Sequence, residues 1–147
     1  MMGLNRPEMP AEIIAERALQ LCGSNFRLHG RSADHGLDCI GLVAQCLAAA
    51  DVSCEVPTGY SIRGGSAEQI VAVMERAGFI VLSRDVGHDK IPLCEGDIVL
   101  ARPSPVQWHL MVRVSDGFVH AHAGLGRVVF TPGPAPWPVI KLFRILA

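Results

Sequence analysis

Hydrophobic positions in the first half of the chain recur three or four residues apart, which is the spacing of an amphipathic helix. This pattern predicts three helices, over residues 10–23, 38–51 and 66–78. Asp38 and Ser66 are suited to cap the second and third helices, and Gly78 is suited to end the third. The segment 24–37 has turn residues and no sustained period, so we expect an ordered loop there.

From Phe79 onward the period changes to two, which is typical of strands buried on one face. Gly, Pro and Asp-Gly separate short strand-like runs at 79–83, 96–103, 108–115, 118–124, 126–132 and 139–146. Their short connections favour an antiparallel meander. The predicted fold class is α+β, with N-terminal helices packed on a curled antiparallel sheet of about five to six strands.

The length of 147 residues suits a single domain, residues 1–147. The formal net charge is -1, so the chain lacks the basic excess with which proteins bind nucleic acid. Glu8, Glu12 and Glu16 stand where a signal peptide would be apolar, and no apolar run is long enough to cross a membrane. We therefore expect synthesis in the cytoplasm without a signal peptide, and neither nucleic acid nor a membrane as a partner.

Cysteine chemistry centres on Cys39, at the predicted start of the second helix. The five cysteines form no C-x-x-C pair, which favours a reduced compartment in which most thiols are small core residues. A helix N-terminus stabilises a thiolate, so we expect the pKa of Cys39 to be lowered. Cys46 lies about two turns further along, where burial would raise the pKa instead.

Three histidines lie on adjacent predicted strands joined by the Asp116-Gly117 turn. A two-residue turn there sets residues opposite each other when their numbers sum to 233. Because that sum is odd, His120 and His122 share a sheet face with His109. In this register Gly124 is opposite His109, His122 is diagonal and His120 is further away, so spacing alone leaves the choice between them open.

A cysteine, a histidine on one strand and a polar residue on the next form the arrangement of a cysteine hydrolase. The histidine takes the thiol proton, and the third residue orients its ring. Two other interpretations are a simple core thiol at Cys39 and a zinc site formed with His109, His120 and His122. The only close pair of potential metal ligands in this set lies along one strand, in "HAH", which does not favour a metal site.

The segments "GLDCIGLV", "WHLMVRV" and "GFVHA" resemble the NlpC family of papain-like cell-wall peptidases. The core motif of that family is Asp-Cys-Ser-Gly-Leu, followed by His-Val-Gly-Ile-Tyr and Phe-Ile-His-Ala. The resemblance spans residues 11–146 in order and spacing. A proline-rich stretch, "TPGPAPWP", is similar to the branch found in tail modules of phages and gene transfer agents.

The resemblance implies that Cys39 is the nucleophile, His109 the general base and acid, and His120 the third catalytic residue. His122 is the alternate, because the hairpin is about one residue shorter than is usual in the family. The backbone N–H of Cys39 would help to hold the oxyanion. Neither a metal nor an organic cofactor is required.

Substrate contacts are expected at Asp38, Phe26 and Trp108. Family members that read a free peptide N-terminus often have a tyrosine upstream of the nucleophile and a serine after it. Here those positions hold Phe26 and Ile40, which lack the hydroxyls, so only Asp38 is left to read an amine. Asp38 is equally suited to be a plain helix cap. Trp108 and Trp137 are suited to line a sugar or peptide cleft, although aromatic residues beside prolines more often simply pack.

The function that follows is a cysteine peptidase that hydrolyses stem peptides of bacterial peptidoglycan. An N-acyl amidase or acyl transferase on the same Cys/His site is one alternative, and a catalytically inactive module of a phage-like tail is another. Without a signal peptide, the protein would reach the cell wall or periplasm as part of a phage-like tail or after lysis. The expected partners are a stem peptide and phage-like tail proteins.

Overall fold

The computed structural model describes residues 8–55, 67–83 and 91–145. Its helices are α1 (Pro10–Leu21), α2 (Cys39–Ala49) and α3 (Glu68–Arg76). A small sheet pairs β1 (Arg31–Ser32) with β2 (Gly36–Leu37). The large sheet is formed by β3 (Phe79–Ser83), β4 (Ile98–Ser104), β5 (Gln107–Val114), β6 (Gly117–His122), β7 (Arg127–Pro132) and β8 (Val139–Ile145).

The helices begin and end close to the predicted positions. Pro10 is the first residue of α1, where its missing N–H removes no helical hydrogen bond. Asp38 caps α2, and its carboxylate accepts a hydrogen bond from the N–H of Gly41 at 2.8 Å. The predicted cap Ser66 lies outside the described residues, and α3 ends shortly before Gly78, which has a φ of 98°.

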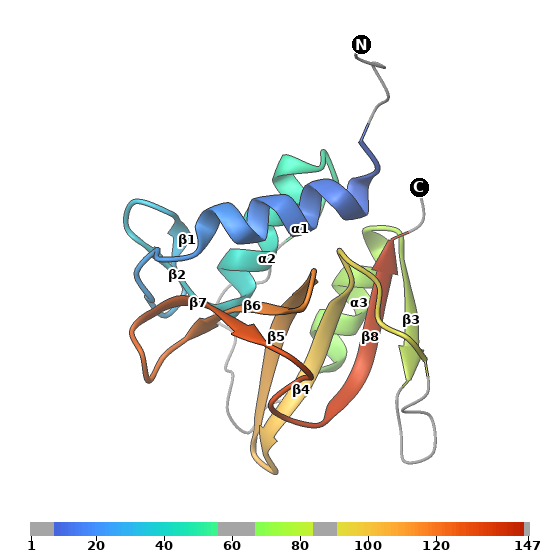
Figure 1. The fold of residues 1–147 in the computed structure, drawn as a ribbon. Coiled ribbons are helices and arrows are strands. Elements are labelled where there is room, and N and C mark those ends of the chain that lie inside the picture. Colours follow the sequence, from blue (N-terminus) through green and yellow to red (C-terminus); the bar gives the residue numbers. More distant parts are fainter. Residues whose placement is uncertain (1–7, 56–66, 84–90, 146–147) are drawn as a thin grey trace.

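The large sheet has the strand order β3-β8-β4-β5-β6-β7, with antiparallel pairs throughout. The predicted meander is confirmed from β4 to β7. It is wrong for β8, which returns from the end of the chain and lies between β3 and β4 (Figure 1). Since β3 and β4 are both antiparallel to β8, they run in the same direction and do not form a hairpin with each other.

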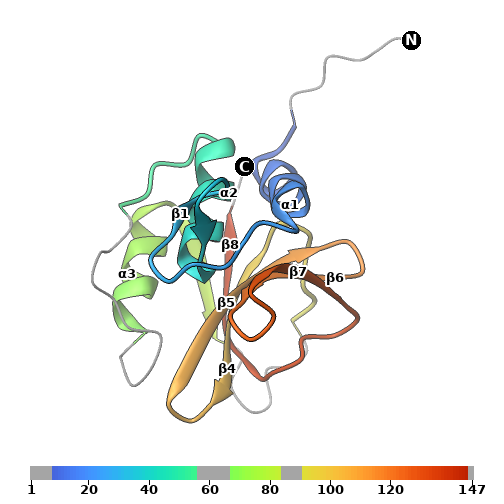
Figure 2. The same cartoon turned by 90° about the vertical axis from the view of Figure 1, so that its left-hand side faces the viewer.

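Two apolar clusters fill the two faces of this sheet. In the larger one, α1 and α2 pack against each other and against β5, while α3 packs against β3 (Figure 2). On β5, Leu110, Val112 and Val114 point into this cluster, whereas Met111 joins the smaller cluster on the other face with Phe118. The predicted α+β class, with helices packed on a six-stranded antiparallel sheet, is confirmed.

The β5–β6 hairpin differs from its predicted register. Val114 pairs with Gly117, so paired residue numbers sum to 231, and the turn residues are Ser115 and Asp116. Asp116, the second of the two turn residues, has the positive φ, 68°, that a type II turn has at this position. Gly117 has another role, because a β-carbon there would collide with the carbonyl of Thr131 on β7.

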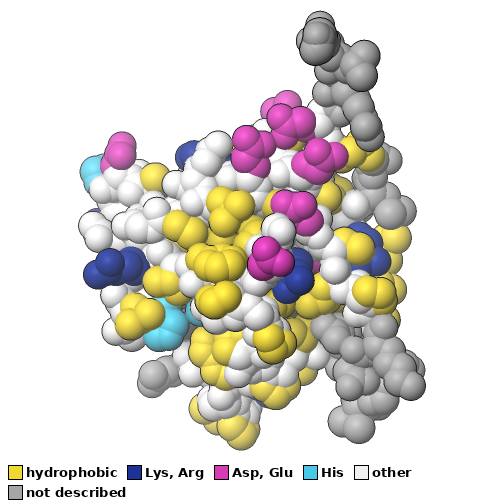
Figure 3. All heavy atoms as spheres, viewed as in Figure 1, with side chains coloured by type: hydrophobic (Ala, Val, Ile, Leu, Met, Phe, Trp, Pro, Cys, Tyr) yellow, Lys and Arg dark blue, Asp and Glu magenta, His cyan; other side chains and the backbone are white. Residues whose placement is uncertain are grey.

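No helix in the described ranges is long and apolar enough to span a membrane. On the face seen in Figure 3, acidic side chains gather at the end of the molecule formed by α1, and hydrophobic side chains occupy the middle. Large hydrophobic residues that are exposed in the described part of the chain are Met9, Leu19, Leu28, Ile80, Val106, Leu125 and Phe130.

Candidate active site

Cys39 is the first residue of α2, as predicted, and it is almost completely buried. Burial raises the pKa of its thiol to about 12, and the neighbouring charge of Asp38 adds to the rise. Backbone hydrogen bonds from Leu110, Cys39 and Ile40 act in the opposite direction and are outweighed. The expectation of a lowered pKa is therefore wrong, because desolvation is stronger here than the field of the helix N-terminus.

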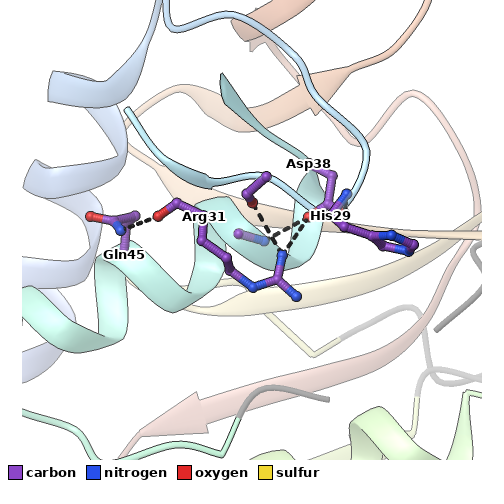
Figure 4. Close-up of polar contacts among 6 residues, drawn as sticks. His29, Arg31, Asp38 and Gln45 are labelled. Carbon is purple, nitrogen blue, oxygen red and sulfur yellow. Dashed lines mark hydrogen bonds and ion pairs between the residues drawn. The ribbon is translucent and has the colours of Figure 1, made fainter. Parts of the chain in front are cut away.

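The carboxylate of Asp38 is buried and holds the preceding loop against α2 (Figure 4). Its Oδ1 accepts from Gly41, and its Oδ2 accepts from the backbone N–H of His29 at 2.8 Å. The guanidinium of Arg31 lies 3.4 Å from Oδ1. The predicted cap is confirmed, but Asp38 is not among the residues that line the cavity beside Cys39.

The loop before α2 is ordered, as expected, although it includes the β1–β2 pair. The side chain of Gln45 on α2 donates a hydrogen bond to the carbonyl of Arg31 (Figure 4). A β-carbon on Gly41 would collide with the carbonyl of Gly30, so this glycine allows the loop to lie directly on the first turn of α2. The packing of this loop on α2 therefore requires a glycine at position 41, the glycine of "DCIGL".

Three polar side chains on adjacent strands form a chain of hydrogen bonds. Nε2 of His109 on β5 lies 2.9 Å from Nδ1 of His120 on β6. Nε2 of His120 lies 2.9 Å from Oγ1 of Thr131 on β7. Both nitrogens of His120 are therefore engaged, and Nδ1 of His109 has no hydrogen bond to any residue in the described ranges.

The two linked imidazoles are neutral at pH 7. Burial lowers the pKa of His109 to about 3, and the charges of His120 and His122 add to this shift. Burial also lowers the pKa of His120 to about 4, with a further contribution from His122. A neutral imidazole has one nitrogen free to accept a proton, which is the form that a general base requires.

His122 is separate from this chain of hydrogen bonds. Its Nδ1 accepts from the backbone N–H of Leu125 at 3.1 Å, and its ring centroid lies 5.7 Å from that of His120. The structure thus links His120, and not the alternate His122, to His109. In the part of the chain that is described, no group of three or more His, Cys, Asp or Glu side chains is arranged to hold a metal ion.

Cys39 and His109 line one cavity of about 200 Å³. The cavity is also lined by Phe26, Pro103, Gln107, Ala121, His122, Ala123, Gly124 and Trp137. The predicted contact Phe26 is thus at the cavity. Trp108 does not line the cavity. Its side chain is buried in the larger apolar cluster, where its Nε1 has no hydrogen-bond partner among the described residues.

Trp137, for which the sequence left both a cleft-lining and a packing role open, lines this cavity. Its ring centroid lies 5.4 Å from that of His109 and 5.6 Å from that of His120, with edge-to-face geometry in both cases. It therefore covers both imidazoles and contributes to their burial. Its aromatic type and its place in the proline-rich stretch at 131–138 were the sequence signals for this position, and they did not predict the contact with the two histidines.

The described helices and the two antiparallel sheets match an α+β papain-like fold of the NlpC/p60 type. NlpC1 from Trichomonas vaginalis matches with a TM-score of 0.67 and 19% identity, over 96% of this chain and 46% of its own. The peptidoglycan hydrolase RipB from Mycobacterium tuberculosis matches with a TM-score of 0.57 and 19% identity, over 94% of this chain and 65% of its own.

A third match is RipD from Mycobacterium tuberculosis, described as a non-catalytic NlpC/p60 domain protein adapted to peptidoglycan binding. Its TM-score is 0.59 at 14% identity, and the match covers 95% of this chain and 100% of RipD. The chain spans about half the length of NlpC1. The sequence matches no protein-family model and no curated protein. At these identities the likeness establishes the fold alone.

Proposed function

We propose that the protein is a cysteine hydrolase that cleaves amide bonds in the stem peptides of bacterial peptidoglycan. The observation that carries this proposal is the shared cavity of Cys39 and His109, with His109 held by His120. This arrangement supports the role of nucleophile for Cys39, of base for His109 and of orienting residue for His120. The substrate class is supported by neighbours of the same fold that include a peptidoglycan hydrolase.

The reaction starts from a neutral thiol and a neutral imidazole. As Sγ of Cys39 attacks the amide carbon, Nδ1 of His109 takes the thiol proton, so that charge separates only during the attack. His109 then protonates the leaving amine as the C–N bond breaks, which leaves a thioester on Cys39. Water, deprotonated by His109, hydrolyses the thioester and restores the thiol.

Acyl transfer on the same site differs only in the last step, in which an amine or alcohol replaces water. The products distinguish the two reactions, because a peptidase leaves free stem fragments and a transferase leaves new linkages. The assignment to a phage-like tail stays a prediction from the sequence resemblance.

A non-catalytic peptidoglycan-binding domain is the second candidate function. Two observations favour it: burial raises the pKa of Cys39 to about 12, and RipD has this fold without catalysis. In that case the cavity would bind a stem peptide and leave it intact.

Digestion of purified peptidoglycan, followed by mass spectrometry of the soluble products, tests the proposal. We expect stem-peptide fragments from the wild-type protein and from Cys46→Ala, and none from Cys39→Ala. Cys46 is the matched control because it is equally buried on the same helix. Binding of peptidoglycan without any fragment would contradict the hydrolase and support the binding domain.

A further inference from the structure

Thr131 extends the catalytic chain of hydrogen bonds to a third strand. In the β6–β7 pair, His120 is opposite Val129 and Phe118 is opposite Thr131. Thr131 is therefore diagonal to His120 on the same sheet face, where its hydroxyl lies 2.9 Å from Nε2. His109, His120 and Thr131 thus stand on three consecutive strands, β5, β6 and β7.

The proton positions in this chain are fixed once His109 has taken the thiol proton. Both nitrogens of His109 then carry hydrogen, and its Nε2–H donates to Nδ1 of His120. A neutral His120 that accepts at Nδ1 carries its own hydrogen on Nε2 and donates it to Thr131. The hydroxyl of Thr131 must therefore accept, which it can do with its free lone pairs.

If both hydrogen bonds of His120 ran in the opposite direction, His109 could not act as the base. If the Thr131 hydroxyl donated to Nε2 of His120, then His120 would carry its hydrogen on Nδ1 and donate it to Nε2 of His109. His109 would then hold its hydrogen on Nδ1, the nitrogen that has to receive the thiol proton. The direction of the two hydrogen bonds made by His120 thus decides whether Nδ1 of His109 can accept the thiol proton.

We propose that Thr131 is a positioning residue that acts through His120 to hold His109 in the tautomer that can deprotonate Cys39. The inference rests on the proposed function of Cys39 and His109. The local packing supports it, because Gly117 on β6 lacks the β-carbon that would collide with the carbonyl of Thr131. Gly117 thus allows the backbone of Thr131 to lie close to β6, the strand that carries His120.

Thr131→Val removes the hydroxyl and keeps the β-branched shape that suits a strand. Thr131→Ser keeps the hydroxyl, and Ser83→Ala is the matched control, since Ser83 accepts a hydrogen bond from Lys141 at 2.9 Å near the opposite edge of the sheet. The first readout is the imidazole ¹⁵N spectrum, which reports the tautomers of His109 and His120. The second is the alkylation rate of Cys39 at pH 7.

We expect His120 to carry its hydrogen on Nε2 in the wild-type protein and to shift toward the Nδ1–H tautomer in Thr131→Val. The loss of one hydrogen bond should slow alkylation of Cys39 roughly tenfold. Thr131→Ser should restore the rate, and Ser83→Ala should leave both readouts unchanged.

An Nδ1–H tautomer of His120 in the wild-type protein would overturn the proposal, even if Thr131→Val failed to fold. Unchanged tautomers and alkylation rate in a folded Thr131→Val would overturn it as well. The predicted tautomers together with an inert wild-type Cys39 would contradict the proposed function and still support the positioning role of Thr131.

Discussion

Nε2 of His109 and Nδ1 of His120 lie 2.9 Å apart, although the two residues are diagonal in the β5–β6 hairpin. The register of Val114 with Gly117, continued along both strands, would set His122 opposite His109. A diagonal pair of rings on one face is within reach, and the Nδ1 of His122 is already engaged by Leu125. The backbone around His122 therefore leaves His120 to orient the base.

The buried carboxylate of Asp38 should matter mainly for stability. Asp38→Asn replaces an oxygen that accepts N–H groups with an amide that donates, so a donor of Gly41 or His29 loses its partner. We expect the free energy of unfolding, measured with urea, to fall by about 1–3 kcal/mol. The exposed Asp34→Asn is the control. An equal, small effect of both changes would contradict this role.

The buried histidines make stability depend on pH. The pKa of His109 is lowered to about 3 and that of His120 to about 4, whereas an unfolded histidine titrates near 6.5. Below pH 6.5 the unfolded chain binds more protons than the folded protein, so stability falls as the pH falls toward these values. One such histidine accounts for about 2 kcal/mol between pH 6.5 and 5.

Urea unfolding at pH 7 and pH 5 checks this dependence. We expect His120→Gln to reduce the difference between the two pH values by about 2 kcal/mol, and the exposed His35→Gln to leave it unchanged. A difference that does not change in His120→Gln would show that the pKa of His120 is not depressed.

Trp137 should control the solvation of both imidazoles. Burial is the largest cause of their lowered pKa values, and the Trp137 ring lies 5.4 Å from His109. Trp137→Ala admits water, so the pKa of His109 should rise toward 6.5 in an NMR titration. Trp108→Phe alters a tryptophan in the larger apolar cluster and should leave the titration unchanged. Equal titrations of wild type and Trp137→Ala would refute this account.

The β5–β6 turn assigns different roles to two adjacent residues. Asp116 has a φ of 68°, so Asp116→Gly should change the free energy of unfolding by less than about 1 kcal/mol. Gly117→Ala places a β-carbon against the carbonyl of Thr131 and should cost about 1–3 kcal/mol. Thermal and urea unfolding of both variants check this. A larger loss for Asp116→Gly would indicate another turn.

Some features of the site follow from patterns that do not depend on exact register. A turn displaced by one residue changes the sum of paired numbers by two and leaves its parity unchanged. His109, His120 and His122 are therefore expected on one face with either turn. The choice of His120 depends on the register and on the backbone after His122, and the spacing of residues does not contain that information.

Other features depend on tertiary burial. The start of α2 at Cys39 was predictable from periodicity and the Asp38 cap, but the sign of the pKa shift was not, because it depends on how completely the thiol is desolvated. Thr131 reaches His120 because β7 pairs with β6. Trp137 reaches His120 from the proline-rich stretch that follows β7. Neither contact is visible in local sequence.

His109 is proposed to activate Cys39. Cys46 provides an internal reference, because it lies on the same helix, is equally buried and has a pKa also raised to about 12. The measurement is the iodoacetamide alkylation rate of both thiols in the native protein at pH 7, read by mass spectrometry, in wild type, His109→Ala and the exposed control His35→Ala.

We expect Cys39 to react at least about tenfold faster than Cys46 in wild type and His35→Ala, with the advantage lost in His109→Ala. His109→Ala also widens the access to Cys39, so a slower reaction in that variant cannot come from shielding. Equal rates for the two thiols in the wild-type protein, or an unchanged Cys39 rate in His109→Ala, would contradict activation of Cys39 by His109.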